Sequence, residues 1–104
     1  VEDKERLILV GDECLKREKY ESAIEVFRFL NNPHKLTLVG DECVKHDQLI
    51  LAAKAYEMAN AIDKLNKVGD IFLQKEQLNN AYEVYKVAGN DTMIQFLREN
   101  FQMV

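Results

Sequence analysis

Residues 10–14 read Val-Gly-Asp-Glu-Cys, and this stretch decides the fold because it returns along the chain. It recurs as Val-Gly-Asp-Glu-Cys at 39–43 and, in part, as Val-Gly-Asp-Ile-Phe at 68–72, so the period is 29 residues. A fixed period of this size is the signature of a stacked-repeat architecture. We therefore predict that the chain is built from copies of one structural unit.

The similarity between the copies extends well beyond this short stretch. A leucine precedes each glycine by four residues, an alanine follows it by twelve, and an aromatic residue follows it by sixteen. These columns are Leu7, Leu36 and Leu65; Ala23, Ala52 and Ala81; and Phe27, Tyr56 and Tyr85. A fourth copy begins in phase with Ile94, Leu97 and Phe101, but Arg98 replaces its glycine. We expect repeats at about 4–32, 33–61 and 62–90, with a half repeat at 91–104.

This spacing of glycine, alanine and aromatic residue resembles the tetratricopeptide repeat, a helix-turn-helix unit, and the likeness covers almost the whole chain. Two features depart from that family: tryptophan is absent, and the period is shorter than the family's ~34 residues. The short period also resembles the less regular solenoids of vesicle-coat and intraflagellar-transport proteins. The resemblance implies an all-α fold, a right-handed superhelical α-solenoid of three helix-turn-helix repeats plus a closing helix.

Apolar residues at three- and four-residue spacing predict seven helices, and no stretch alternates as a strand would. We expect the helices at about 2–17, 20–30, 33–45, 48–60, 62–75, 77–88 and 92–102. Asn32 is expected to cap the third helix, with Pro33 in its first turn. Gly89 is expected to end the sixth helix, and Asn90 to cap the seventh.

The repeated glycines fall inside predicted helices, where glycine costs about 1 kcal/mol relative to alanine. A glycine at the same position of each repeat indicates a steric need, since a residue without Cβ lets a paired helix approach closely. We expect the alanine column to supply the matching small surface, and the aromatic column to pack toward the following repeat. These are core residues rather than a cofactor site.

Length and composition describe one folded domain. The chain has 104 residues, of which 47% are apolar and 31% charged, and its net charge is −4. A negative charge argues against a general binder of nucleic-acid phosphates. No apolar run approaches the ~18 residues of a membrane span, so we expect no membrane insertion. The chain begins in a charged helical segment, and we expect it to be a piece excised from a larger protein.

The two cysteines hold equivalent positions, Cys14 and Cys43, where the later copies have Phe72 and Phe101. This is therefore expected to be an apolar core column. Equivalent positions on stacked helices lie ~8–10 Å apart, whereas a disulfide needs Cα atoms within ~7 Å. We expect buried free thiols rather than a disulfide or a metal site. Free thiols fit a cytoplasmic, reducing compartment.

The sequence shows no constellation of catalytic residues. His34 and His46 have no second ligand at metal spacing, and we expect both at the surface. Adjacent carboxylates such as Asp12 and Glu13 point to different helix faces, so they do not form the acid/base pair of general catalysis. We expect no enzyme activity, no cofactor and no metal.

The resemblance implies that the first helices of the repeats line a concave groove. One column there is acidic throughout, and it is flanked by an apolar column. The expected groove residues are Asp12, Leu15, Lys16, Asp41, Val44, Lys45, Asp70, Leu73 and Glu99. Such a surface suits a basic and apolar peptide and would repel an acidic one. Alternatively, the acids form a solvated face or satisfy helix ends locally.

We expect a non-catalytic protein–protein interaction module that binds a peptide or partner segment in this groove. The alternative is a structural spacer in a large coat or intraflagellar-transport-type solenoid, with end-to-end contacts. Those contacts would use the exposed side of the first helix and, on the last helix, Ile94, Leu97 and Phe101 together with Phe96 and Val104, because no second helix follows to cover them. An uncovered end favours self-association.

Overall fold

The computed structural model describes residues 2–103, in which seven α-helices and no strands occur. The all-α prediction is confirmed, and every helix ends within one residue of its predicted bounds. Val1 and Val104 lie outside the described residues, and so does the apolar contact predicted for Val104.

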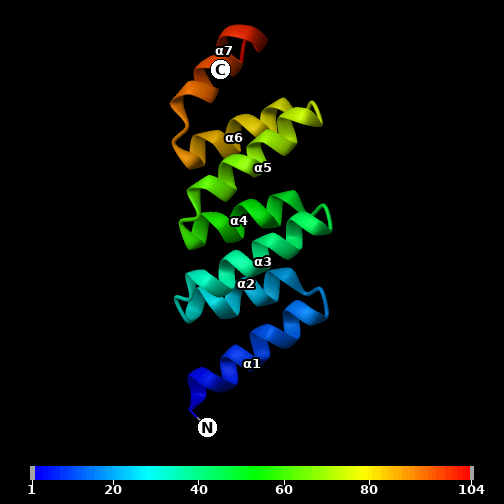
Figure 1. The fold of residues 1–104 in the computed structure, drawn as a ribbon, viewed down its shortest axis with the longest axis vertical. Coiled ribbons are helices and arrows are strands. Elements are labelled where there is room, and N and C mark those ends of the chain that lie inside the picture. The colour runs from blue at the N-terminus through cyan, green and yellow to red at the C-terminus, as the bar shows by residue number, and fades with distance from the viewer. Residues whose placement is uncertain (1, 104) are drawn as a thin grey trace. The chain divides into compact units, whose positions relative to one another are not determined.

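The helices group into two compact units, residues 1–60 and residues 61–104, each described here by itself. The first unit holds two hairpins, α1 (Asp3–Lys16) with α2 (Tyr20–Phe29) and α3 (Pro33–Lys45) with α4 (Leu49–Ala59). The second holds the hairpin of α5 (Ile62–Gln74) and α6 (Leu78–Ala88), followed by α7 (Asp91–Phe101). The repeat is thus a helix-turn-helix unit (Figure 1). The single domain and the superhelical course of the whole chain stay predictions.

Three helix boundaries carry the capping groups that the sequence predicted. The side chain of Asn32 accepts a hydrogen bond from the backbone N–H of Lys35, and Pro33 opens α3. Asn90 caps α7 in the same way, through the N–H of Met93. Gly89 ends α6 with φ of 70°, a left-handed conformation that glycine adopts without a steric penalty.

The turn inside each hairpin is the same in the three repeats. An acidic residue in the left-handed region follows the first helix, and these residues are Glu18, Asp47 and Glu76. The next N–H returns to a carbonyl five residues back, as from Lys19 to Cys14 at 2.8 Å. This is the bonding pattern of a Schellman motif, which satisfies carbonyls at the end of the helix.

Each hairpin closes where an aromatic ring of the second helix lies on the glycine of the first. A Cβ built on Gly40 would lie 2.4 Å from Cε1 of Tyr56, and one on Gly11 would lie 2.5 Å from Cζ of Phe27. The steric need for glycine is therefore supported, but the predicted partner was wrong. The aromatic ring of the same repeat meets the glycine, so the ring does not simply face the following repeat.

Within each unit a second helix also packs on the first helix of the next repeat, α2 on α3 and α6 on α7. This second contact buries the leucine, the valine and the cysteine or its equivalent that the repeat places on a first helix. In α3, Leu36, Val39 and Cys43 are 3%, 0% and 0% exposed. In α7, Ile94 and Leu97 are 9% and 0% exposed.

The predicted end face on α7 is corrected by this packing. Ile94 and Leu97 are core residues, because their column faces the preceding second helix and α6 already covers it. Phe101 is exposed, and its ring lies edge-on to exposed Phe96, with centroids 6.1 Å apart. Phe101 therefore also departs from the predicted core column.

The α1 residues equivalent to this buried stripe are the ones left partly exposed. Among its residues only Gly11 is fully buried. Val10 is 49% exposed, and Leu7 and Cys14 are half-buried. The sequence predicted this stripe as core, and that was wrong in α1 because, within residues 2–103, no second helix packs on α1 as α2 packs on α3.

Substituting Gly40 by alanine tests the closure of the hairpin. Overpacking against a rigid buried ring costs about 1–3 kcal/mol, which outweighs the gain of about 1 kcal/mol in helix propensity. We expect urea unfolding, followed by circular dichroism, to show a lower free energy of unfolding. In a Tyr56→Leu background the same substitution should be neutral or stabilising. An equal cost in both backgrounds would contradict the contact.

Candidate functional site

The acidic column predicted to line the groove has partners within the protein. In the second and third repeats the tyrosine that lies on the glycine donates its hydroxyl hydrogen to the next residue of the first helix. Tyr56 donates to Asp41 and Tyr85 to Asp70, both at 2.6 Å. Burial raises the pKa of each tyrosine, and the hydrogen bond to the carboxylate raises it further. These two acids therefore help to hold the hairpins closed.

The first repeat differs because its aromatic residue, Phe27, has no hydroxyl. Asp12 pairs instead with Lys35 of the next repeat, with Nζ and Oδ1 2.9 Å apart. The Lys35 ammonium also lies 5.9 Å from the centre of the Phe27 ring. This partly buried pair links α1 to α3. Glu99, on α7, accepts a hydrogen bond from Gln95 of the same helix.

A pocket of about 520 Å³ lies between α1 and α3 in the first unit. Three predicted groove residues line it, namely Asp12, Leu15 and Lys16. Three others were missed by sequence reasoning, namely Leu9, Glu13 and Glu42. The signal for Glu13 and Glu42 was present, since both follow the repeated aspartate in equivalent positions. The lining combines three carboxylates with two leucines and one lysine.

Two of these carboxylates pair with a cation on their own helix, Glu13 with Arg17 at 2.8 Å and Glu42 with Lys45 at 3.3 Å. The pair of Glu13 is exposed, and such a pair contributes about 0–1 kcal/mol, so an incoming cation can replace it. Oε2 of Glu42 is also buried and makes no hydrogen bond, although Lys45 lies near it.

The remaining predicted groove residues lie outside this pocket. On α3, Asp41 and Val44 are half-buried and Lys45 is exposed. In the second unit, Asp70 is exposed on α5 and Leu73 is half-buried there. Whether a ligand contacts any of them stays a prediction.

Sequence reasoning also missed an exposed apolar column on the second helices. Phe29, Met58 and Val87 hold equivalent positions there and all are exposed, Phe29 most of all at 74%. Their common phase, 29 residues apart, was the available signal.

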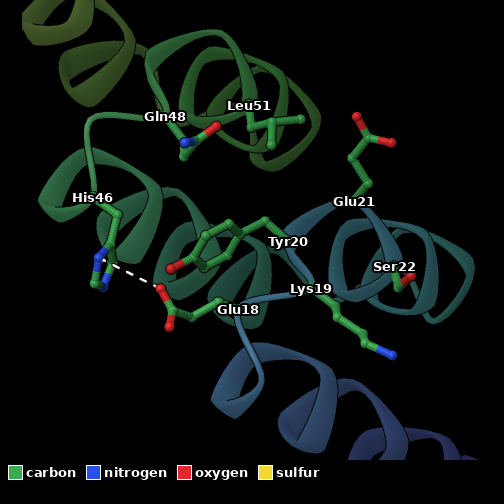
Figure 2. Close-up of a pocket in the computed structure, with 8 residues that line it drawn as sticks. All are labelled: Glu18, Lys19, Tyr20, Glu21, Ser22, His46, Gln48 and Leu51. Atoms are coloured by element: carbon green, nitrogen blue, oxygen red, sulfur yellow. Dashed lines mark ion pairs between the residues drawn. The ribbon is translucent and has the colours of Figure 1, made fainter.

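A second pocket, of about 530 Å³, lies where the first hairpin meets the second (Figure 2). Tyr20, at the start of α2, reaches toward the end of α3, where its ring lies 6.1 Å from that of His46. The imidazole Nδ1 of His46 is 3.7 Å from the carboxylate of Glu18. Burial raises the pKa of Tyr20, and the neighbouring Glu18, Cys43 and Glu42 raise it further. This arrangement joins two repeats.

In comparisons with known proteins, no protein-family model, no curated protein and no solved structure matches this chain. The resemblance to tetratricopeptide repeats therefore rests on its own residues and stays a prediction. Within residues 2–103, none of the helices combines the length and the apolar character needed to cross a bilayer.

Removing the hydroxyl of Tyr85 tests the bond to Asp70. Tyr85→Phe keeps the ring on Gly69, and we expect it to lower the free energy of unfolding by about 1 kcal/mol. Because the pKa of Tyr85 is raised in the folded state, this contribution is present below the pKa of ~10 of an unfolded tyrosine and is lost as pH rises above it.

A double-mutant cycle with Asp70→Asn, measured by urea unfolding, isolates this interaction. A coupling energy near zero would show that the short distance contributes nothing to stability.

The two thiols provide a third test. Both cysteines are free, as predicted, but they differ in burial. Cys43 is fully buried, and burial raises its pKa to about 11, whereas Cys14 is half-buried beside a pocket. Because the thiolate is the reactive form, iodoacetamide should modify Cys14 first in the native protein and Cys43 only after unfolding. Equal rates, read by peptide mass spectrometry, would contradict this difference.

Proposed function

We propose that this chain is a non-catalytic protein–protein interaction module that holds a basic and apolar segment of a partner protein between α1 and α3. The observation that carries the proposal is the pocket of about 520 Å³ in which carboxylates surround Leu9 and Leu15. Lysine and arginine have long apolar stems that can cover leucine while the cationic head meets a carboxylate. The free thiols support an intracellular, reducing location.

Glu13 and Glu42 are the acids best placed to meet such a ligand. Asp12, Asp41 and Asp70 take part in internal contacts that bridge helices, so their substitution would disturb the fold together with any binding. The exposed pair of Glu13 can exchange partners with little effect on stability, and Oε2 of Glu42 makes no hydrogen bond that a ligand would have to break.

A peptide panel tests the proposal. The probes are ten-residue peptides that alternate lysine with leucine, glutamate with leucine, and lysine with serine. We expect the lysine–leucine peptide to bind most tightly and to shift the amide NMR signals of residues 9–16 and 42. Glu13→Gln with Glu42→Gln should weaken binding roughly threefold to tenfold.

The matched control is Glu25→Gln with Glu83→Gln, which removes two exposed charges paired with Arg28 and Lys86 on second helices. This control should leave binding unchanged. Equal weakening by both double variants would indicate nonspecific attraction to an acidic protein and would overturn the groove site.

The alternative function, a structural spacer in a larger solenoid, is supported by exposed apolar residues on both α1 and α7, Leu9 and Val10 on the former and Phe96 and Phe101 on the latter. A spacer would make its contacts through such a face and would tolerate the loss of Glu13 and Glu42. Self-association through the last helix would depend on Phe96 and Phe101, because Ile94 and Leu97 are buried.

A further inference from the structure

The outer face of α1, formed by Arg6, Leu9, Val10, Cys14 and Arg17, is apolar in its middle and basic at both ends. Leu9 is 65% exposed and Val10 is 49% exposed. Beside them lies a pocket of about 370 Å³, whose lining is Leu9, Val10, Glu13, Cys14, Arg17 and Lys19.

The protein itself shows what covers such a face. One repeat later, Val39 and Cys43 of α3 replace Val10 and Cys14, and both are fully buried. Packing within the hairpin does not account for this difference, since α1 is paired with α2 as α3 is with α4. The additional cover on α3 is α2, the second helix of the preceding repeat.

The first turn of α2 shows which side chain belongs in the pocket. Tyr20 packs against the ring of His46, and its pKa is raised by burial and by the nearby charges of Glu18, Cys43 and Glu42. One repeat earlier, the positions of His46, Cys43 and Glu42 are held by Arg17, Cys14 and Glu13, which line the open pocket of α1. The pocket therefore occupies the place that an equivalent of Tyr20 would fill.

The charges on the covered face also repeat. His46 faces the carboxylate of Glu18, two residues before Tyr20 (Figure 2). Lys35 lies over the ring of Phe27, seven residues after Tyr20. The equivalents of His46 and Lys35 on α1 are Arg17 and Arg6, whose partners, Glu13 and Asp3, lie on α1 itself in exposed pairs.

We propose that the outer face of α1 binds an amphipathic helix of a partner protein that carries an acidic residue, a tyrosine two residues later, and an aromatic residue seven further on. The tyrosine enters the pocket beside Cys14. The acid meets Arg17, and the aromatic ring lies under Arg6. This proposal goes beyond the groove function because it uses the part of α1 around Cys14. Leu9 and Glu13 line both pockets, and the two sites are told apart by Glu42, which lines only the groove pocket, and Cys14, which lines only this one.

The probe is a synthetic peptide with the sequence of residues 18–31, which carries this pattern. Glu25→Lys in the peptide allows a lactam bridge to Glu21, at two positions that are exposed in α2, and the bridge keeps the short helix folded. We expect the peptide to bind the whole protein and to slow iodoacetamide labelling of Cys14 several-fold. Cys43 is the internal reference and should stay unreactive.

Reciprocal charge reversal tests the register. Arg17→Glu in the protein should weaken binding of the peptide, measured by fluorescence anisotropy, roughly fivefold. Glu18→Arg in the peptide should restore binding to the Arg17→Glu protein, and it should not improve binding to the unchanged protein. Lys86→Glu, on the exposed side of α6, is the matched control and should change nothing.

Three results would overturn the proposal. The first is binding without protection of Cys14. The second is faster labelling of Cys43, which would mean that the peptide had displaced α2. The third is protection of Cys14 by raising the concentration of the protein alone, with a matching rise in mass by light scattering, which would assign the face to a second copy of this chain.

Discussion

The contact between an aromatic ring and a helical glycine is the constraint on which the other interactions depend. With a Cβ only 2.4–2.6 Å from ring atoms in each hairpin, no other residue fits without displacing the ring. The ring then carries its para position to the next residue of the first helix. In Tyr56 and Tyr85 that position is a hydroxyl, and the residue it meets is the repeated aspartate. A steric requirement at one column thus determines the hydrogen bonding of another.

Much of the fold was predictable because the signals for helix bounds are local. Asn32, Asn90 and Gly89 act on their own helix ends, and the sequence contains all of that information. The partner of the glycine was not predictable in the same way. A period identifies which residues are equivalent, but it does not show whether the alanine column or the aromatic column faces the glycine column. Alanine and aromatic residue were equally periodic, and only packing shows that the ring meets the glycine.

The same limitation explains the errors at the candidate sites. Ile94 and Leu97 were expected to stay exposed unless a following helix covered them, whereas their side chains face the helix that precedes α7. α6 therefore covers them in α7, and their counterparts on α1 stay open. The acidic column was likewise recognised as a column, but its tyrosine and lysine partners come from residues 15 and 23 positions away. Glu13 and Glu42 line one pocket because α1 and α3 lie close together, and the 29-residue period does not reveal that proximity.

Arg98 gives the fourth copy a different chemistry from the first. It stands in the glycine column, so a second helix could not close on α7 with its ring in contact with the backbone, as the earlier hairpins do. Its guanidinium instead turns to α6, where it donates to the hydroxyl of Tyr82 at 2.9 Å and 3.2 Å and lies over the ring. The Arg98 side chain thereby stabilises the packing of α7 against α6. α1 keeps its glycine and its closed hairpin, and it leaves apolar surface on the opposite side. The face that α2 covers on α3 is therefore open on α1, whereas α6 already covers the same face of α7, so the first and the last helix of the chain differ in the surface that they leave exposed.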